Sequence, residues 1–558
     1  MTVRIILFIF LISQSVFGWQ TSGDFTSSNL PIVIINTNDQ DIPYDDPRII
    51  AEMQIIYQEN GERNLVSDSA NNYSGNISLE IRGESSATWD IKSYGFETQN
   101  EDGSNRNVSL LGLPEDNDWV LHAPYFDRSL LRNVLSYHLS REMGWYASRT
   151  VYCEVILNDE YQGIYVLMEK IKKDKNRVDI ATLSPEEISG DDVTGGYILR
   201  VDKEGWSSGI DSSFPTTEHS NVIIRYQYYY PKADEITPEQ EEYIGGFIQD
   251  FEELMHDGDY TDPINGYSKY LNVDSFVDYL ILNELSRNVD GYRLSSYLTK
   301  QKDSDGGKLI AGPAWDYNFS YGNAGYYEAE RTEGWQLLYF NDDQNFLRND
   351  NFQVPFWWKI LFNDGDFTKR LNQRWFQLRQ GILSSDSLNN TIDGFADITT
   401  EARTRNFEVR PAPGSNNLGG GWFPYDPRNN QIQSYEDELT LTKNWIVERA
   451  NWIDSNIGLL TANANEDKSK VQGFKLMQNY PNPFNPTTQI AFEIPTASHV
   501  ALSIYNVQGQ AILELVNRTL NSGRHQVDVN ASQLSSGVYF YRLTVEDFQQ
   551  TRKMMLIK

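Results

Sequence analysis

The hydrophobic positions along the chain follow two different periods, and the change of period divides the sequence into parts. In the first half, apolar residues recur at every second position in short runs, as in 30–37, 77–83 and 151–171. This period predicts half-buried strands. The polar triplet Asn158-Asp159-Glu160 separates two such runs and predicts a hairpin turn.

Helical spacing appears once among these strands and then dominates the second half. Asp127 is suited to cap a helix whose apolar positions are Leu130, Leu131, Val134, Leu135 and Leu139. Further on, amphipathic segments cover 238–258, 273–287, 356–381 and 434–457. A β-rich part followed by a mainly helical part predicts an α+β domain with two lobes.

The pattern breaks at 461–473, where TANANEDKSKVQG is polar, charged and rich in small residues. Such a composition predicts a linker. Short alternating apolar runs with turn residues between them return afterwards and end in KMMLIK. This pattern predicts a small all-β, immunoglobulin-like sandwich over 474–558.

The N-terminus has the features of a secretory signal peptide. One Arg precedes an apolar run at 5–11, which extends to Phe17 and is followed by the small residue Gly18. We expect cleavage after Gly18, a short N-terminal linker at 19–29 and a working domain over 30–460. No other segment approaches the roughly 18 apolar residues that a membrane-spanning helix needs, so we expect a soluble exported protein.

The composition narrows the class of protein further. The chain has 558 residues, of which 39% are hydrophobic, and a formal net charge of −31. This charge argues against nucleic acid as a partner and favours neutral or basic partners. The single cysteine, Cys153, cannot form an internal disulfide, and its apolar surroundings predict a buried small hydrophobe rather than a catalytic thiol.

The stretch 285–323 carries the candidate chemistry. It predicts two strands around a polar turn, with Asp290 before the first strand and Asp316 after the second. An antiparallel hairpin brings its ends together, and two adjacent carboxylates are best explained by a cation between them. Asn288 adds a neutral oxygen. Oxygen ligands suit Mg²⁺, Mn²⁺ or Ca²⁺ rather than zinc, and the layout is similar to that of kinase-type phosphoryl-transfer enzymes.

A nucleotide would need cations as well. The segment IRGESSATWDIKSYGFET provides Arg82 and Lys92, and a basic run at 170–177 follows Glu169. No GxGxxG or Walker loop is present, so a phosphate site would be unconventional. The basic run indicates either an anion site or a solvated face.

Six segments together resemble the CotH kinase family in order and spacing over roughly residues 30–455. They are IRGESSATWDIKSYGFET, LLGLPEDNDWVLHAPYFDRSLLRNVLSYHLSREMG, LNDEYQGIYVLMEKIKKDKNRVDI, GGYILRVDK, NELSRNVDGYRLSSYL and AGPAWDYNFSYGN. The resemblance implies an atypical protein kinase-like fold that binds ATP with Mg²⁺ and phosphorylates Ser or Thr of secreted or surface proteins.

The resemblance also implies roles for single residues. Asp290 of NVDG matches the catalytic acid, and Asp316 of WDYN matches the metal-binding acid, with Asn288 or Asn318 as further metal ligands. Lys92 matches the Lys before SYGFET and is a candidate for contacting the ATP phosphates. Arg82 is a second phosphate candidate, and Glu169 is a candidate to pair with Lys92. Arg132 and Asn133 match a further motif, for which helix packing is an equal explanation.

The tail resembles the type A C-terminal sorting domain of the type IX secretion system. The matching residues are QNYPNPFNPTT, IYNVQGQ, SSGVYFYRL and the basic end TRKMMLIK. The resemblance implies Sec export in a bacterium of the Bacteroidota type, then passage through the type IX machinery to the cell surface or the medium. A carbohydrate-binding sandwich is the alternative for this part.

Two other functions stay open for the working domain. One is a non-catalytic surface or adhesion protein on a kinase-like scaffold, because an exported protein works where ATP is scarce. The other is a metal-dependent hydrolase that uses the same two acids, although the His-rich ligand set common in such enzymes is missing. For a kinase, the charge of −31 favours a basic acceptor protein.

Overall fold

The computed structural model describes residues 25–83, 87, 89–203, 208–216, 222–341, 350–410, 431–468, 474–479, 481–520, 523–546 and 548–558. The predicted signal peptide and most of the predicted N-terminal linker lie outside these residues. The chain forms two compact units, of which the first contains 1–134, 148–170 and 390–441. The second contains 135–147, 171–389 and 442–558.

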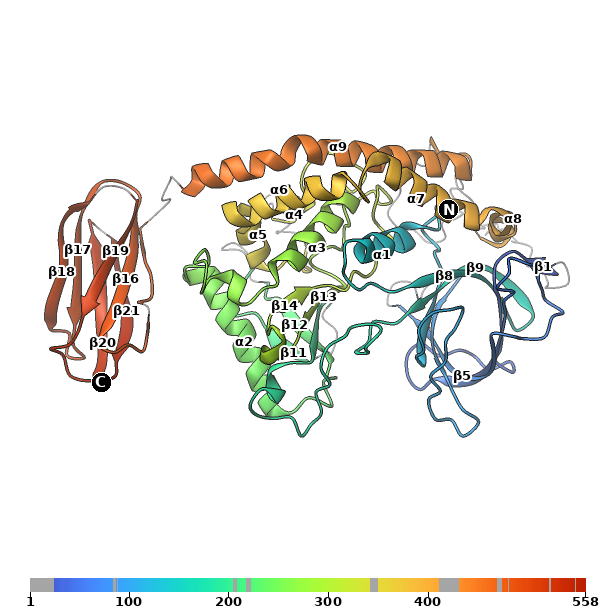
Figure 1. The fold of residues 1–558 in the computed structure, drawn as a ribbon, viewed down its shortest axis with the longest axis horizontal. Coiled ribbons are helices and arrows are strands. Elements are labelled where there is room, and N and C mark those ends of the chain that lie inside the picture. The colour runs from blue at the N-terminus through green and yellow to red at the C-terminus, as the bar shows by residue number, and fades with distance from the viewer. Residues whose placement is uncertain are drawn as a thin grey trace, which may run out of the picture. The chain divides into compact units, whose positions relative to one another are not determined.

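The first unit is built on a closed β-barrel. Its strands follow one another around the barrel as β2 (Ile32–Asn36), β3 (Ile49–Ile56), β5 (Tyr73–Arg82), β6 (Ser93–Thr98), β7 (Asp118–His122), β9 (Glu160–Glu169) and β8 (Thr150–Leu157). Figure 1 labels β5, β8 and β9 of this barrel. Neighbours are antiparallel except β2 and β8, which are parallel and close the barrel. Alternation in β3 puts Ala51, Met53 and Ile55 into the core. Cys153 is fully buried in β8, as predicted.

Short elements complete this unit. β1 (Ser27–Ser28) pairs with β4 (Asn64–Leu65), and α8 (Thr400–Val409) packs against β9. α7 (Ser385–Ile398) precedes α8. The predicted hairpin turn lies between β8 and β9, where Asn158 and Asp159 both have positive φ (49° and 61°), as a tight hairpin requires.

Asp127 caps α1 (Arg132–Glu142), as predicted. Its Oδ2 accepts a hydrogen bond of 2.7 Å from the backbone N–H of Arg132. The guanidinium of Arg132 is fully buried between the carboxylates of Asp127 and Glu438. Packing therefore explains the motif around Arg132, and no substrate contact is needed to account for it.

The second unit contains a five-stranded antiparallel sheet. Its strand order is β11 (Gly209–Asp211), β12 (Arg225–Tyr230), β10 (Tyr197–Val201), β13 (Ser296–Lys300) and β14 (Leu309–Ala311). β13 and β14 form the predicted hairpin, with Leu298 opposite Ala311 and Lys300 opposite Leu309. The turn between them holds the short 3₁₀ helix η5 (Asp303–Asp305); the other two are η3 (Asp192–Thr194) and η4 (Tyr267–Lys269).

Helices supply the rest of this unit. They are α2 (Pro238–Asp257), α3 (Val273–Ser286), α4 (Gln336–Phe340), α5 (Phe356–Asn363), α6 (Gly365–Arg379) and α9 (Tyr435–Lys468), and α3 packs against α6. The segment expected as one helix at 356–381 is two, because Asp364 ends α5 and caps α6 by accepting from Asp366 N and Phe367 N. α9 continues into the first part of the segment predicted as a linker and ends at Lys468.

The C-terminal part is a two-sheet β-structure. One sheet has the order β15 (Lys475–Leu476), β16 (Thr487–Ile494) and β19 (Gly523–Asn530). The other has the order β18 (Ala511–Leu520), β17 (Ser498–Tyr505), β20 (Gly537–Val545) and β21 (Phe548–Leu556). Phe492 of one sheet and Leu502 and Leu543 of the other belong to one hydrophobic core. This part is thus all-β, as predicted, and the chain as a whole mixes α and β structure.

No helix within the described ranges is both long enough and apolar enough to cross a membrane.

Candidate functional site

The end of α3 sets the position of Asn288 and Asp290. Arg287 terminates the helix in the left-handed conformation (φ 48°, ψ 49°). The chain then turns tightly, with Gly291 N donating to Asn288 O (3.1 Å) and Leu294 N donating to Asp290 O (2.9 Å). A Cβ on Gly291 would lie 2.6 Å from Asn283 Oδ1, so a larger residue here would force the buried Asn283 side chain to move.

The hairpin ladder is shorter than predicted. Pairing between its two strands ends where Leu298 faces Ala311, well short of both acids. Loops therefore carry the chain on to Asp290 and Asp316. Asn288 connects the two: its Oδ1 accepts from Asp290 N (3.2 Å), and its Nδ2 donates to Asp316 O (3.4 Å).

Asp316 is held by residues from two directions. Its backbone N–H donates to the hydroxyl of Tyr137 on α1 (3.2 Å), and its φ is 61°. Its Oδ1 accepts from Asn318 Nδ2 (2.7 Å), and Asn318 O in turn accepts from Asn323 Nδ2 (2.8 Å). Asp316, Asn318 and Asn288 thus belong to one hydrogen-bonded region, with the Asp316 side chain partly exposed.

Asp290 lies in a strongly charged environment. Its side chain is 18% exposed, and burial raises the pKa of its carboxyl. Arg293 and Lys203 act in the opposite direction, while Asp202 and Asp350 raise the pKa further. Arg293 contacts both Asp290 Oδ1 (3.5 Å) and Asp350 Oδ1 (3.6 Å). The ionised carboxylate is therefore disfavoured, and a bound cation would relieve this cost.

Tyr326 is close to both acids. It packs on the small hydrophobic cluster around Val289, next to Asp290. Burial raises the pKa of its hydroxyl well above the usual value, and the charges of Asp290 and Asp316 both add to the shift. The two carboxylates therefore act on one and the same side chain.

The donor atoms of this region determine which metal fits. In the part of the chain that the structure describes, no group of three or more His, Cys, Asp or Glu side chains is arranged to hold a metal ion. A metal here would use the carboxylates of Asp290 and Asp316, amide oxygens of Asn288 or Asn318, and water. This all-oxygen set fits Mg²⁺, which keeps several waters and needs only one or two carboxylates.

The predicted nucleotide contacts belong to the first unit. Arg82 faces Ser93 across the β5–β6 ladder, so it lies near Lys92. The ammonium of Lys92 donates to the backbone carbonyls of Ala87 (2.9 Å) and Trp89. Lys92 therefore holds its own loop in this structure.

The expected pairing of Lys92 with Glu169 is not formed. Glu169 is fully buried, and its carboxylate binds Arg149 through the side chain (2.8 Å) and the backbone N–H (2.9 Å). The reason is the β8–β9 ladder, which puts Arg149 directly beside Glu169. Glu169 thus pairs with Arg149 because the two are neighbours in the barrel, and the sequence alone does not reveal this proximity.

Two lysines of the basic run after Glu169 have partners nearby in the fold. Lys170 pairs with Asp118 (3.4 Å), and Lys173 donates to Thr182 (2.6 Å). These contacts give no specific support to the alternative of an anion site.

Sequence reasoning missed four charged residues around Asp290. They are Asp202, Lys203, Arg293 and Asp350. The available signal was the motif GGYILRVDK, which ends with Asp202 and Lys203 and was used only for its resemblance. The antiparallel pairing of Val201 with Ser296 explains how the end of this motif reaches the turn that follows α3.

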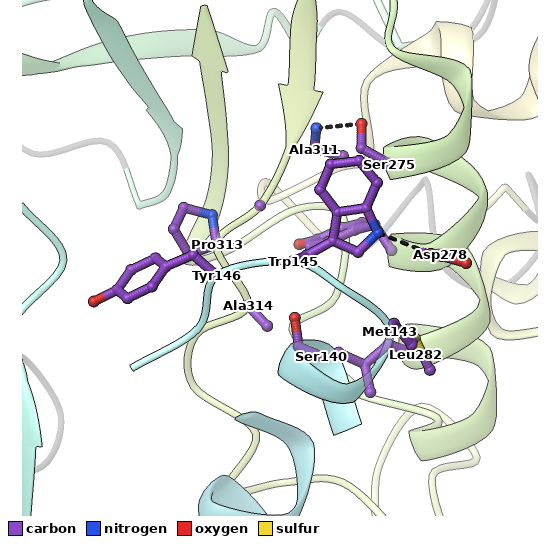
Figure 2. A pocket seen from close by; sticks show the side chains of 12 residues that line it. Ser140, Met143, Trp145, Tyr146, Ser275, Asp278, Leu282, Ala311, Pro313 and Ala314 are labelled. Atoms are coloured by element: carbon purple, nitrogen blue, oxygen red, sulfur yellow. Dashed lines mark hydrogen bonds between the residues drawn. The ribbon is translucent and has the colours of Figure 1, made fainter. Parts of the chain in front are cut away.

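A pocket beneath the hairpin does not include either acid. Figure 2 shows it between the end of α1, α3 and the segment after β14, with aromatic and aliphatic walls that include Met143, Trp145 and Pro313. Its carboxylate, Asp278, accepts from Trp145 Nε1 (2.8 Å) and from Arg374. The Asp278 carboxylate is thus already paired with Arg374, so we assign this pocket a packing role next to the hairpin rather than a second acid site.

The fold and this region define a mixed α/β protein in which Asn288 connects Asp290 and Asp316, with all-β sheets at the C-terminus. The family model described as CotH kinase protein matches residues 79–453, more than half of the chain, so the chain belongs to that family. The model described as secretion system C-terminal sorting domain matches residues 478–558. Both resemblances noted in the sequence are confirmed. No curated protein matches the chain.

The sorting domain indicates where the cell sends the protein. It indicates secretion or attachment to the cell surface, and it implies contact with the secretion machinery. The tail therefore acts in export, and the chemistry must be sought in residues 79–453.

Proposed function

We propose that the protein is a secreted atypical protein kinase, dependent on Mg²⁺, that transfers the γ-phosphate of ATP to Ser or Thr of secreted or surface proteins. The observation that carries the proposal is the connection of Asp290 and Asp316 through Asn288 in a chain of the CotH kinase protein family. A kinase-like arrangement of the β-rich and helical parts belongs to the same proposal.

The donor set supports a role for Mg²⁺, with Mn²⁺ as a substitute. Asp316 would be the main ligand, and Asp290, Asn288 and Asn318 are the further oxygen donors of this region. Asn318 already fixes the orientation of the Asp316 carboxylate through its 2.7 Å hydrogen bond. Bound Mg²⁺–ATP would supply the transferable phosphoryl group, with its charge partly neutralised.

Asp290 is the proposed catalytic acid–base residue. The acceptor hydroxyl oxygen forms a bond to the γ-phosphorus, and the bond from that phosphorus to the β–γ bridging oxygen breaks, so that ADP leaves. The hydroxyl proton passes to the Asp290 carboxylate and then to solvent. Burial raises the pKa of Asp290, which makes its carboxylate a stronger proton acceptor.

Thermal unfolding of the full-length chain tests the nucleotide site. Mg²⁺–ATP at 100 times its Kd should add about 2.7 kcal/mol of stability, and the shift should be lost in Asp316→Asn. Asp305→Asn is the matched control, because Asp305 is exposed in the turn at the other end of the same hairpin. Absence of a shift with any nucleotide and metal in the wild type would refute the proposal.

Phosphoryl transfer needs its own assay. We expect labelled γ-phosphate to reach protein acceptors in the wild type and not in Asp290→Asn, and basic acceptor peptides to be labelled better than acidic ones. Losing one group that stabilises the transition state commonly costs on the order of 10²–10³ in rate. Binding without transfer to any acceptor would contradict kinase activity.

A second function is favoured by one observation, the sorting domain at 478–558. It directs the protein to a compartment where ATP is scarce, which suits a non-catalytic surface or adhesion protein on the same scaffold. The thermal unfolding experiment distinguishes the two functions, because an adhesion protein would show no metal-dependent response to nucleotide.

A further inference from the structure

The turn after α3 brings an arginine to the carboxylate of Asp290. Arg293 follows Asp290 by three residues, and the N–H groups of Arg293 (3.4 Å) and Leu294 (2.9 Å) both donate to the carbonyl of Asp290. Tyr292 has a positive φ of 69°, so the chain reverses tightly at this point. The two side chains therefore meet, and Arg293 Nη2 lies 3.5 Å from Asp290 Oδ1.

Arg293 has little freedom to move. Its side chain is 3% exposed, and it donates to the carbonyls of Val289 (Nε, 2.9 Å) and Phe352 (Nη1, 3.0 Å). The rings of Tyr327 and Phe340 lie 5.1 and 5.3 Å from the guanidinium carbon. These contacts with backbone and aromatic groups hold the guanidinium in one orientation.

Asp350 is the second carboxylate on this guanidinium. Its Oδ1 lies 3.6 Å from Arg293 Nη1 and accepts from the backbone N–H of Phe352 (2.7 Å). Its Oδ2 accepts from the hydroxyl of Tyr327, whose ring packs on Arg293. Both oxygens of Asp350 thus have donors fixed by the fold, so Asp350 is a rigid counter-ion that keeps Arg293 in place.

The two carboxylate oxygens of Asp290 differ in their surroundings. Oδ1 accepts from Arg293, whereas no donor in the part of the chain that the structure describes binds Oδ2. The side chain is 18% exposed, so solvent reaches this carboxylate. A contact at Oδ1 restricts rotation of the carboxylate, and the direction of Oδ2 is thereby set.

We propose that Arg293 is a positioning residue of the acid site: it holds Asp290 through Oδ1 and so presents Oδ2 to the acceptor hydroxyl, while Asp350 keeps Arg293 in place. This inference rests on the proposed function, because it concerns the residue proposed to take the hydroxyl proton. As the hydroxyl oxygen bonds to the γ-phosphorus and ADP leaves, its proton goes to Oδ2 and then to solvent. Arg293 contributes orientation alone, and a misplacement of about 1 Å can cost on the order of 10² in rate.

Steady-state kinetics of the full-length chain separate orientation from binding. The probes are Mg²⁺–ATP with labelled γ-phosphate and a pool of basic peptides that contain Ser and Thr. Arg293→Gln should lower kcat by on the order of 10- to 100-fold. KM for Mg²⁺–ATP should change by less than about 3-fold, since orientation of Asp290 matters in the transition state and not in nucleotide binding. Arg293→Lys should restore part of kcat, because it keeps the charge without the planar fork that also reaches Asp350.

Asp350→Asn tests the second step of the proposal. It removes the charge and keeps the shape, so kcat should fall, but less than in Arg293→Gln. Because Asp350 acts on Asp290 only through Arg293, the double variant should lose no more than Arg293→Gln alone. A loss equal to the product of the two single losses would overturn the role of Asp350.

Arg379→Gln is the matched control. Arg379 is 13% exposed, pairs with Asp454 (2.9 Å), donates to the carbonyl of Leu383 and lies 5.9 Å from the ring of Trp375. These are the same kinds of contact that Arg293 makes, and none of these partners belongs to the acid site. Arg379→Gln should lower the urea midpoint and leave kcat unchanged.

Calorimetric titration with Mg²⁺–ATP gives a readout that does not depend on turnover. Wild-type Kd together with a reduced kcat in Arg293→Gln supports positioning. An unchanged kcat in the folded variant, or a parallel loss of Kd and kcat, would overturn this inference and leave the kinase proposal intact. If Arg293→Gln does not fold, Arg293→Lys and Asp350→Asn decide by the same criteria. If the wild type transfers no phosphate, the proposed function fails and this inference fails with it.

Discussion

Arg449 and Glu284 form a buried ion pair that stabilises the helix leading into the region of Asn288 and Asp290. Their side chains are 0% and 1% exposed, and Arg449 Nη2 lies 3.0 Å from Glu284 Oε2. Arg449 also donates to the carbonyls of Glu284 (2.7 Å), Thr332 (3.0 Å) and Gly334 (2.6 Å). The Glu284 carboxylate accepts from the N–H groups of Gln336 and Leu337, each at 2.8 Å. The pair thus joins α9, α4 and the helix that leads into Asn288.

We predict that Arg449→Met will lower the free energy of unfolding by about 3–5 kcal/mol, because it leaves a buried carboxylate without its cation. Glu284→Gln should also be strongly destabilising. Burial already lowers the pKa of the Arg449 guanidinium to about 9, and the charge of Glu284 opposes this shift. The double variant should lose less than the sum of the two, with a coupling of about 0.5–3 kcal/mol.

Urea unfolding followed by tryptophan fluorescence measures these losses. The 13 Trp residues all precede the C-terminal sandwich, so the signal excludes the tail. Trp335 and Trp452 lie within 6.0 and 5.0 Å of the Arg449 guanidinium. Arg370→Met is the control: Arg370 pairs with Asp274 at 3.5 Å, but the two are 58% and 78% exposed. This exposed pair should contribute at most about 1 kcal/mol. A loss for Arg449→Met no larger than the control, or strict additivity in the double variant, would refute the reasoning.

Three further predictions concern pH, reactivity and the turn at the site. Burial raises the pKa of Glu252 in the folded state, so its contribution to stability is present below about pH 4 and is lost as the pH rises through the folded pKa. Between pH 4 and 7, the difference in free energy of unfolding between Glu252→Gln and the wild type should therefore shift in favour of the variant; a pH-independent difference would contradict this. Burial raises the pKa of the Cys153 thiol to about 12. A thiol reagent at pH 8 should therefore label Cys153 only after unfolding. Rapid labelling of the native protein would contradict this prediction. Gly291→Ala should lower the free energy of unfolding by about 1–3 kcal/mol through overpacking, because the new Cβ would displace the Asn283 side chain. The same variant should lose the thermal response to Mg²⁺–ATP. An unchanged response would show that the turn does not position the acids.

Local patterns were predicted well because they depend on near neighbours in the chain. Alternation and the Asn158-Asp159 turn predicted the β8–β9 hairpin, and helical spacing predicted α2 and α3 with ends correct to within a residue. Asp127 caps α1 as expected. The long motifs were sufficient for the family and for the sorting domain. In each case the information lies within a short stretch of sequence.

Tertiary contacts decided the rest. The barrel closes through the parallel pairing of β2 with β8, which no local pattern encodes. Glu169 binds Arg149 because the ladder makes them neighbours, although Lys92 was the expected partner. The pairing of β10 with β13 brings the end of the GGYILRVDK motif to the turn that follows α3. The sequence alone thus predicted most of the strands and helices, the CotH kinase protein family and the C-terminal sorting domain. The partner of each charge was determined only when distant segments packed together, because a charge interacts with whatever lies nearest in space.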